Sequence, residues 1–169
     1  MSDSIKIDSA LAERVAAQLI ARRQTLAISE SSAGGLISAA LVAVPGASSF
    51  FLGSCVIYTA KAREALLGVM PATIANIRSS TPEMSHLLAG TVRTQLGTDW
   101  GLAETGATGP SGNRYGDAAG HCCLAVVGPH EASLTLETGS ADRSANMVAF
   151  ANAALALLEQ ALGSQPVRA

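Results

Sequence analysis

The chain has 169 residues, a length that suits one domain with one hydrophobic core. Apolar residues make up 49% of the sequence and aromatic residues only 4%, so the core must consist of small side chains that pack closely. The formal charge is -2, from 11 basic and 13 acidic residues, and no run of lysine or arginine could follow a phosphate backbone. We therefore expect a single domain over residues 1–169 and no nucleic-acid partner.

The cysteines and the apolar segments argue against a metal site and a membrane. Cys55 lies apart from the adjacent pair Cys122 and Cys123, and a pair inside an apolar run is typical of a core rather than of metal ligands. The N-terminus lacks the basic and apolar regions of a signal peptide, and the longest apolar stretch, 33–44, is shorter than the about 18 residues that cross a bilayer. We expect a cytoplasmic protein with no membrane partner, no metal and no cofactor.

The first third of the chain predicts two helices that flank a strand. Apolar residues repeat at helical spacing after a capping Asp8 or Ser9, and a β-prone segment then runs into a polar, glycine-rich turn. In chain order we expect a helix from 8 or 9 to about 23, a strand over 25–29, a turn over 30–35 and a helix over 36–44.

The rest of the chain continues this alternation after the break at Pro45 and Gly46. Thr59 can cap one helix, and Ser80, Thr81 and Pro82 are typical of the start of another. We expect a buried strand over 51–58, helices over 59–67 and 80–96, a strand over 100–105, a glycine-rich loop over 106–117, a hairpin of 120–127 with 132–138, and a helix over 142–162. This order indicates a single three-layer α/β/α domain with a mixed sheet.

Two serines lie where the first strand passes into the second helix. Unpaired N–H groups at such a turn can bind an anion or an oxyanion, and Ser31 or Ser32 can act as nucleophile or ligand. Gly34 and Gly35 carry no Cβ, which lets a substrate approach the backbone. The alternative is that one of the serines only caps the helix.

A second glycine-rich loop follows the strand over 100–105. Ligand-binding loops of α/β sheets lie at the carboxyl ends of strands, which makes Thr105, Gly106 and Gly109 candidate binding residues. The alternative is a long turn without a ligand. It is not a Walker motif, because the lysine that should follow the glycines is absent.

A serine nucleophile needs a group that takes its proton. A neutral lysine amine can do so and a tyrosine can relay the proton, which makes Tyr58 and Lys61 candidates, while a solvated helix residue is the alternative for Lys61. The histidines lack the setting of a catalytic triad and are predicted to be structural or solvated: His86, His121 and His130.

In this order the motifs resemble the C-terminal domain of the competence-damage protein CinA, a family that includes the stand-alone nicotinamide mononucleotide deamidases. The resemblance spans nearly the whole chain. The family's E-S-C-T-G-G corresponds to 30–35, its P-G-A-S or G-S-S segment to 45–49, its strand with a terminal tyrosine to 51–58, its L-G-V to 67–69 and its T-G-I-A-G-P to 105–110, and its G-D-R is approximated by 139–143. The resemblance implies an amidohydrolase that converts nicotinamide mononucleotide into nicotinate mononucleotide and ammonia.

Carried over to this sequence, the resemblance places Ser31 as the nucleophile and Tyr58 as the family tyrosine. The implied substrate-binding residues are Glu30, Ser32, Gly34, Gly35, Arg63, Thr105, Gly106 and Gly109, with backbone N–H groups of 32–35 as oxyanion or phosphate donors.

The chain departs from the family pattern at several polar positions. The family lysine stands five residues after the tyrosine, where this chain has Arg63, and Lys61 lies about 200° away around the helix. Arginine stays protonated and cannot act as a base. The other departures are Ala60 for asparagine, 78–81 for G-A-V-S and 117–120 for K-P-V-G.

Two functions remain open. The first is an amidohydrolase in which Ser31 attacks and Tyr58 and Lys61 handle protons. The second is a nucleotide-binding module or homo-oligomeric scaffold with the same pocket, and a homo-oligomer is expected in either case. Amidase-signature enzymes are excluded, because those chains are much longer and carry their lysine far upstream of the serine pair.

Overall fold

The computed structural model describes residues 6–164, which form one five-stranded sheet in the order β2-β1-β3-β4-β5. β1 runs parallel to both of its neighbours, whereas β4 is antiparallel to β3 and to β5, so the predicted mixed sheet is confirmed. The strands are β1 (Leu26–Glu30), β2 (Phe51–Val56), β3 (Trp100–Ala107), β4 (His121–Val127) and β5 (Ala132–Glu137).

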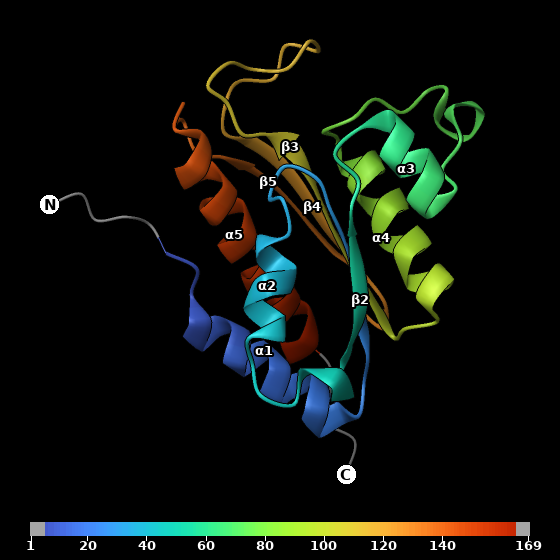
Figure 1. The fold of residues 1–169 in the computed structure, drawn as a ribbon, viewed down its shortest axis with the longest axis vertical. Coiled ribbons are helices and arrows are strands. Elements are labelled where there is room, and N and C mark those ends of the chain that lie inside the picture. The colour runs from blue at the N-terminus through green and yellow to red at the C-terminus, as the bar shows by residue number, and fades with distance from the viewer. Residues whose placement is uncertain (1–5, 165–169) are drawn as a thin grey trace, which may run out of the picture.

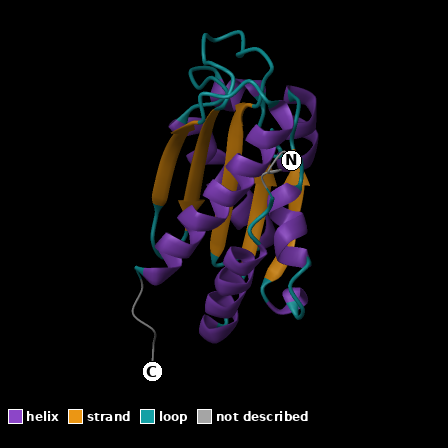
Figure 2. Ribbon diagram, turned by 90° about the vertical axis from the view of Figure 1, so that its left-hand side faces the viewer, coloured by secondary structure: helices purple, strands orange, loops and turns teal. Residues whose placement is uncertain are grey.

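Helices cover both faces of this sheet and give the predicted three layers (Figures 1 and 2). One face carries α1, α2 and α5 over a core that includes Trp100 and Phe150, and the other carries α3 and α4 over a smaller core around Met84. The helices are α1 (Ser9–Arg22), α2 (Leu36–Val42), α3 (Ala60–Leu67), α4 (Pro82–Leu96) and α5 (Arg143–Gly163), with short 3-10 turns at Ala47–Ser49 and Pro71–Ile74.

Polar side chains at the predicted positions begin four of the helices. Asp8, Thr59, Thr81 and Asp142 each accept a hydrogen bond from an N–H group in the first turn of the helix that follows. A cap of this kind stabilises a helix by about 1 kcal/mol. By contrast α2 begins at Gly35 without any capping hydroxyl or carboxylate at that position.

The prediction of a buried strand over 51–58 is wrong. β2 is an edge strand, in which Leu52, Ser54 and Val56 are exposed while the residues between them are half-buried. An edge strand has one neighbouring strand, so apolar side chains remain accessible on it. β3 is two residues longer than predicted, because Gly106 and Ala107 pair with β4.

α5 is the one described helix that is long and apolar enough to cross a membrane by length and composition alone. Half of its apolar window is buried inside the protein, where Phe150, Leu155 and Leu158 are fully enclosed. It contacts the sheet and α1, as expected of a core helix in an α/β fold.

The residues singled out by sequence meet at one edge of the sheet. The carboxyl ends of β1, β2 and β3 lie there together with the start of β4 and the end of β5. The long loop between β3 and β4 rises above this edge, and the first turn of α5 lies beside it (Figure 1). Ligand sites of open α/β sheets are found at such an edge.

Candidate functional site at the carboxyl edge of the sheet

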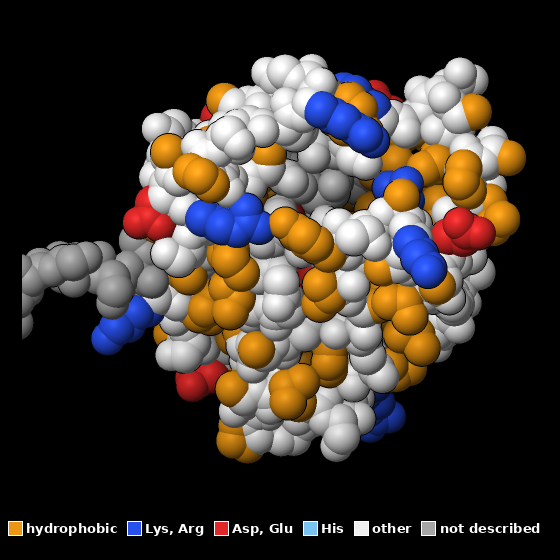
Figure 3. Space-filling model, turned by 45° about the horizontal axis from the view of Figure 1, so that its top comes forward, with side chains coloured by type: hydrophobic (Ala, Val, Ile, Leu, Met, Phe, Trp, Pro, Cys, Tyr) orange, Lys and Arg blue, Asp and Glu red, His pale blue; other side chains and the backbone are white. Residues whose placement is uncertain are grey.

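Viewed toward this edge, the surface is hollowed and basic side chains lie around the hollow (Figure 3). A separate groove of about 610 Å³ lies on the outer side of α4, and no predicted site residue lines it. Its walls are formed by Leu67, His86, Leu87, Gly90, Thr91, Thr94 and Gln95. The predicted site residues lie instead in the turn at Ser31 and in the segments beside it.

A buried carboxylate holds the turn that carries the two serines. Glu104, in the middle of β3, is fully buried, and its Oε2 accepts from the N–H groups of Ser31 at 2.9 Å and Ala33 at 2.8 Å. Its Oε1 accepts from the hydroxyl of Ser32. Burial raises the pKa of Glu104 above its ordinary value, although these three donors act in the opposite direction. The backbone of the serine turn is thus fastened to the centre of the sheet.

A second buried carboxylate begins α2. Glu30 is fully buried and accepts from the N–H groups of Gly35 at 2.9 Å, Ile37 at 3.1 Å and Ser38 at 2.8 Å. A negative charge at a helix N-terminus is favourable, because the unpaired N–H groups and the helix dipole both point toward it. Glu30 therefore lies inside the turn, where it replaces a capping hydroxyl.

These two carboxylates occupy most of the N–H groups that we expected to face a substrate. Ala33 and Gly35 donate to them, and the N–H of Gly34 donates to the carbonyl of Ser31 at 3.2 Å. Over the described residues, only the N–H of Ser32 in this turn has no acceptor within the fold. The predicted set of oxyanion or phosphate donors is thereby reduced to one.

Gly34 serves the packing of the fold. Its φ of +68° is in the left-handed region, and a Cβ there would lie 3.0 Å from the methyl group of Met147 on α5. A side chain at this position would meet both backbone strain and a packed neighbour. The glycine pair thus lets the turn lie against α5, and its contact with a substrate stays a prediction.

Of the two serines, only Ser31 has a free hydroxyl. Ser31 is half-buried, and within residues 6–164 its Oγ makes no hydrogen bond, whereas the hydroxyl of Ser32 is tied to Glu104. Neither serine caps α2, whose N-cap residue is Gly35, so the capping alternative is wrong. Ser31 is therefore the hydroxyl of this turn that is available to a ligand.

Tyr58 lies beyond the end of β2 and is exposed. Its hydroxyl accepts from Nη2 of Arg143 at 2.7 Å, and Nη1 of the same guanidinium donates to the carbonyl of Gly109 at 2.6 Å. Arg143 thereby joins α5 to the loop after β3 and to the end of β2. We did not predict it as a site residue, although it is the arginine of the segment that approximates G-D-R.

Lys61 and Arg63 lie on opposite sides of α3, as their spacing predicts. Lys61 is exposed and, within the described part of the chain, makes no hydrogen bond or ion pair and does not contact Ser31 through one. Arg63 is half-buried; its Nη1 donates to Ser79 Oγ at 3.4 Å, and its Nε is buried without a partner. The side of α3 that faces the protein thus carries the arginine.

The predicted residues of the second loop mainly serve the sheet. Thr105 is buried and its Oγ1 accepts from the N–H of Ser80 at 3.3 Å. A Cβ on Gly106 would lie 2.5 Å from the carbonyl oxygen of His121, so β4 can pair closely with β3 only at a glycine. Gly109, with φ of +108°, exposes the carbonyl that Arg143 binds.

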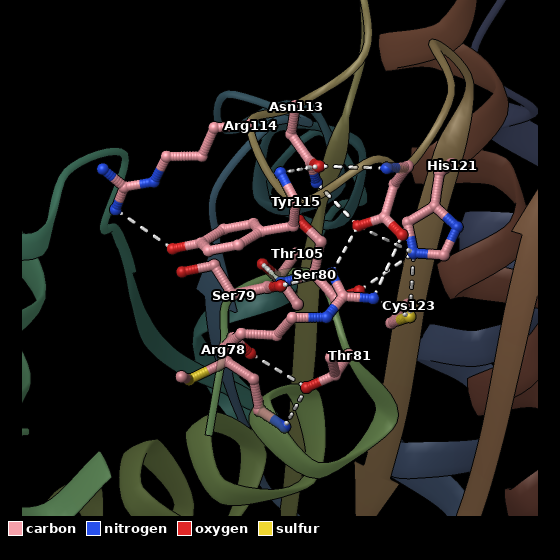
Figure 4. Close-up of polar contacts among 12 residues, drawn as sticks. Arg78, Ser79, Ser80, Thr81, Thr105, Asn113, Arg114, Tyr115, His121 and Cys123 are labelled. Atoms are coloured by element: carbon pink, nitrogen blue, oxygen red, sulfur yellow. Dashed lines mark hydrogen bonds and ion pairs between the residues drawn. The ribbon is translucent and has the colours of Figure 1, made fainter. Parts of the chain in front are cut away.

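The loop between β3 and β4 is fastened by a bidentate ion pair (Figure 4). The two terminal nitrogens of Arg78 donate to the carboxylate of Asp117 at 2.6 and 3.1 Å. Asn113 adds a hydrogen bond to this carboxylate at 2.7 Å, and its Oδ1 accepts from the N–H groups of Tyr115 and Asp117. Arg78 first, and then Asn113 and His121, lower the pKa of Asp117 to about 2 despite the opposing effect of burial.

His121 connects this loop to the start of α4 and to β5. Its Nδ1 contacts the carboxylate of Glu137, and its Nε2 lies 2.9 Å from the carbonyl oxygen of Ser80. Both partners are acceptors, so both ring nitrogens must carry a proton, which only the imidazolium form allows. Burial lowers the pKa of His121, but the hydrogen bonds to Glu137 and Ser80 outweigh it and raise the pKa above its ordinary value. The predicted structural role of this histidine agrees with these contacts.

Departures from the family pattern that are far apart in the sequence lie together in the structure. Arg63 contacts Ser79, and Arg78 pairs with Asp117, so three departing segments form one cluster.

Among the described residues, no group of three or more His, Cys, Asp or Glu side chains could hold a metal ion.

Comparison with known proteins identifies the family of this chain. The model of the CinA C-terminal domain family matches residues 8–162. A CinA-like protein of Synechococcus sp. (strain RCC307) is 38% identical over 122 residues, which are 72% of this chain and 29% of that protein. One of Myxococcus xanthus (strain DK1622) is 39% identical over 122 residues, again 29% of its length. The chain therefore spans less than a third of these curated relatives.

Solved structures of similar proteins share the fold over nearly the whole chain. The competence damage-inducible protein A (ComA) of Klebsiella pneumoniae subsp. pneumoniae MGH 78578 superposes with a TM-score of 0.88 at 25% identity, covering 95% of this chain and all of that one. A CinA superfamily protein of Enterobacter cloacae gives 0.84 at 28% identity and covers 96% of both chains. On the family match and the identities of its relatives, this chain belongs to the CinA C-terminal domain family.

Proposed function

We propose that this chain hydrolyses the carboxamide of a nicotinamide nucleotide, converting nicotinamide mononucleotide into nicotinate mononucleotide and ammonia. The observation that carries the proposal is the free hydroxyl of Ser31 in a turn whose backbone is fastened by Glu104. A nucleophile held in place reacts faster than a mobile one, because the cost of orienting it has been met on folding. Membership in the CinA family, which the sequence motifs associate with this reaction, supports the same proposal.

In the proposed reaction, Ser31 Oγ attacks the carboxamide carbon and loses its proton. The C–N bond then breaks, the nitrogen leaves as ammonia after gaining a proton, and water hydrolyses the acyl-serine ester. The N–H of Ser32 is the proposed donor to the oxyanion. Tyr58, which follows β2, and Lys61, in the first turn of α3, are both exposed and are the proposed proton carriers.

A second function, nucleotide binding without hydrolysis, is favoured by two observations. The side of α3 that faces the protein carries Arg63, and a guanidinium cannot take a proton from serine. The hydroxyl of Tyr58 is also engaged, by Arg143. A site of this kind would bind the nucleotide and leave its amide intact.

Ammonia release from nicotinamide mononucleotide distinguishes the two functions. We expect wild-type protein to release ammonia, Ser31→Ala to release none, and Ser54→Ala, an exposed serine on the edge strand, to match wild type. Melting temperatures with and without the nucleotide should be measured on the same three proteins. A rise in melting temperature without ammonia would replace the amidohydrolase by the binding module, and neither signal would contradict both.

A further inference from the structure

The loop between β3 and β4 carries Arg114 and Tyr115, and Arg78, which precedes α4, lies against the same tyrosine (Figure 4). The guanidinium carbon of Arg114 lies 5.1 Å from the centre of the Tyr115 ring and that of Arg78 lies 5.5 Å from it. Nη2 of Arg114 donates to the Tyr115 hydroxyl at 3.0 Å. Arg78 and Arg114 thus lie against the ring of Tyr115, and Arg63 on α3 reaches Ser79, the residue next to Arg78.

The charges in this cluster do not balance. Asp117 is the carboxylate that pairs with it, and both of its oxygens are taken by Arg78. Over residues 6–164, neither Arg63 nor Arg114 has an acidic side chain within ion-pair distance. Two guanidinium groups thus remain without a counterion within the described chain.

Arg63 also has one buried donor without a partner among the described residues. Its Nε is buried without an acceptor, and its one hydrogen bond, to Ser79, is long at 3.4 Å. A buried donor without a partner is unfavourable, and native proteins rarely keep one unless a ligand or water completes it. The guanidinium group of Arg63 can therefore donate further hydrogen bonds to a ligand.

The pKa of Tyr115 is lowered by the basic side chains around it. The hydrogen bond from Arg114 lowers the pKa of Tyr115 against the opposing effect of burial, and the charge of Arg114, Ser79 and Arg63 act in the same direction as that hydrogen bond. The scaffold around it is fixed, because Asn113 and the pair of Arg78 with Asp117 hold the loop on both sides of Arg114. The positive potential is thus held in place by the fold.

From these observations we propose that Arg63, Arg114 and Ser79 form a subsite for a phosphate group of the ligand, next to the Tyr115 hydroxyl. Two uncompensated guanidinium groups match the two charges of a phosphate monoester, and their planar forks suit its oxygens. Ser79 and Tyr115 add hydroxyl donors. The inference rests on the proposed function only for the rest of the ligand, since phosphate binding itself requires no hydrolysis.

Part of this subsite departs from the family motifs quoted above. Its members lie at positions 63, 79, 114 and 115, and the first two depart from the family motifs together with Arg78 and Asp117, which support them. Arg143, which belongs to the shared G-D-R segment, is on α5 at the other face of the sheet. The departing residues at 63, 78, 79 and 117 are therefore in contact with one another and form one unit of the proposed subsite.

Calorimetric titration of the full chain with inorganic phosphate tests the proposal. We expect one phosphate per chain, and dissociation constants about tenfold or more higher for Arg63→Gln and Arg114→Gln, because each loses a charge-assisted hydrogen bond. Arg63→Lys should bind with intermediate affinity, since it keeps the charge and loses the fork. Arg14→Gln, which removes an exposed arginine on α1, is the charge-matched control and should bind like wild type. Equal weakening in the control, or none in Arg63→Gln and Arg114→Gln, would overturn the subsite.

A spectroscopic titration separates this subsite from general charge effects and from protein that fails to fold. The chain has two tyrosines, so in Tyr58→Phe the tyrosinate absorbance reports on Tyr115 alone. Bound phosphate should neutralise the arginines and raise the pKa of Tyr115, and Arg63→Gln should abolish this rise while the melting temperature stays close to that of wild type. An unchanged tyrosine titration at saturating phosphate would contradict the proposal. Phosphate binding without ammonia release would remove the proposed hydrolysis and keep the subsite.

Discussion

The two sides of the serine turn differ in the sign of their charge and in how that charge is used. On its inner side, Glu30 at the end of β1 and Glu104 on β3 are fully buried and accept hydrogen bonds from the backbone and from serine hydroxyls. Beside it, Arg63 and Arg114 are half-buried or exposed and have no carboxylate partner within the described chain. The two glutamates stabilise the turn, whereas the two arginines have donors available for a ligand.

The comparison teaches which changes should affect folding and which should affect binding. Loss of a buried acceptor leaves several donors unpaired, and the cost appears in the free energy of unfolding. Loss of an exposed guanidinium changes little in the fold, since exposed ion pairs contribute little, and the cost appears in ligand affinity. The following predictions test this division from the largest expected effect to the smallest.

Glu104→Gln should give the largest loss of stability. The amide keeps one oxygen and replaces the other by an NH2 group, so it cannot accept from both the two N–H groups and the hydroxyl, and we expect the free energy of unfolding to fall by about 3 kcal/mol in urea denaturation. Glu13→Gln, an exposed glutamate on α1, is the control and should change it by less than about 0.5 kcal/mol. A loss below about 1 kcal/mol for Glu104→Gln would contradict the claim that the buried acids stabilise the fold whereas the arginines serve ligand binding.

Gly34→Ala should be the next most damaging change. Alanine at a φ of +68° costs about 1 kcal/mol, and its Cβ would also displace the Met147 methyl group, so we expect a loss of about 2 kcal/mol. Gly97→Ala provides the matched comparison, because its φ of +64° is similar and nothing lies within 4 Å of the added Cβ. Equal losses in the two variants would show that α5 does not constrain the turn.

The pH dependence of stability should report on His121. Because its pKa is raised in the folded protein, its stabilising contribution is fully present below about 6.5, the ordinary value, and is lost as the pH rises through the folded value. The groups that face it are Glu137 on β5, Asp117 in the loop, the Ser80 carbonyl before α4, and Cys123 on β4, with Arg78 beyond Asp117.

We therefore expect the free energy of unfolding of wild type to decrease between pH 6 and pH 8.5, and His121→Asn to show a smaller decrease. His86→Asn, an exposed histidine that pairs with Glu131, controls for general titration and should follow wild type. A wild-type stability that rises over this range, with His121→Asn unchanged, would rule out the imidazolium.

Arg78→Gln should have the smallest effect on stability and a larger one on acid tolerance. The pair with Asp117 holds the pKa of that carboxylate at about 2, so its contribution is present above the ordinary value of 3.8 and is lost as the pH falls toward 2. Acid titration followed by circular dichroism should show Arg78→Gln unfolding at a slightly higher pH than wild type. Identical acid transitions would show that the pair does not hold the loop.

Much of the fold could be predicted from local patterns. Capping residues such as Thr59 and Thr81 define helix starts through contacts within one turn, and the alternation of strands and helices defines the layers. The position of β2 at the sheet edge could not be predicted, because its apolar residues are compatible with either a central or an edge strand. Strand order depends on pairing between segments distant in sequence.

Parts of the candidate site could likewise be predicted from the sequence, and other parts could not. The turn at Ser31 was visible as a motif, and the opposition of Lys61 and Arg63 follows from helix geometry. Glu104 was missed, although a carboxylate within an apolar strand is itself a signal of a buried hydrogen-bonding role. Its partners could not be predicted, because they lie 71 to 73 residues away in the sequence.

The most direct test of the central claim is the mass of the protein quenched during turnover of nicotinamide mononucleotide. If Ser31 is the nucleophile, an acyl adduct should be found on the peptide that contains it and should be absent from Ser31→Ala, while Ser54→Ala forms it as wild type does. Ammonia release without any adduct on this peptide, or an adduct that persists in Ser31→Ala, would contradict the assignment of Ser31.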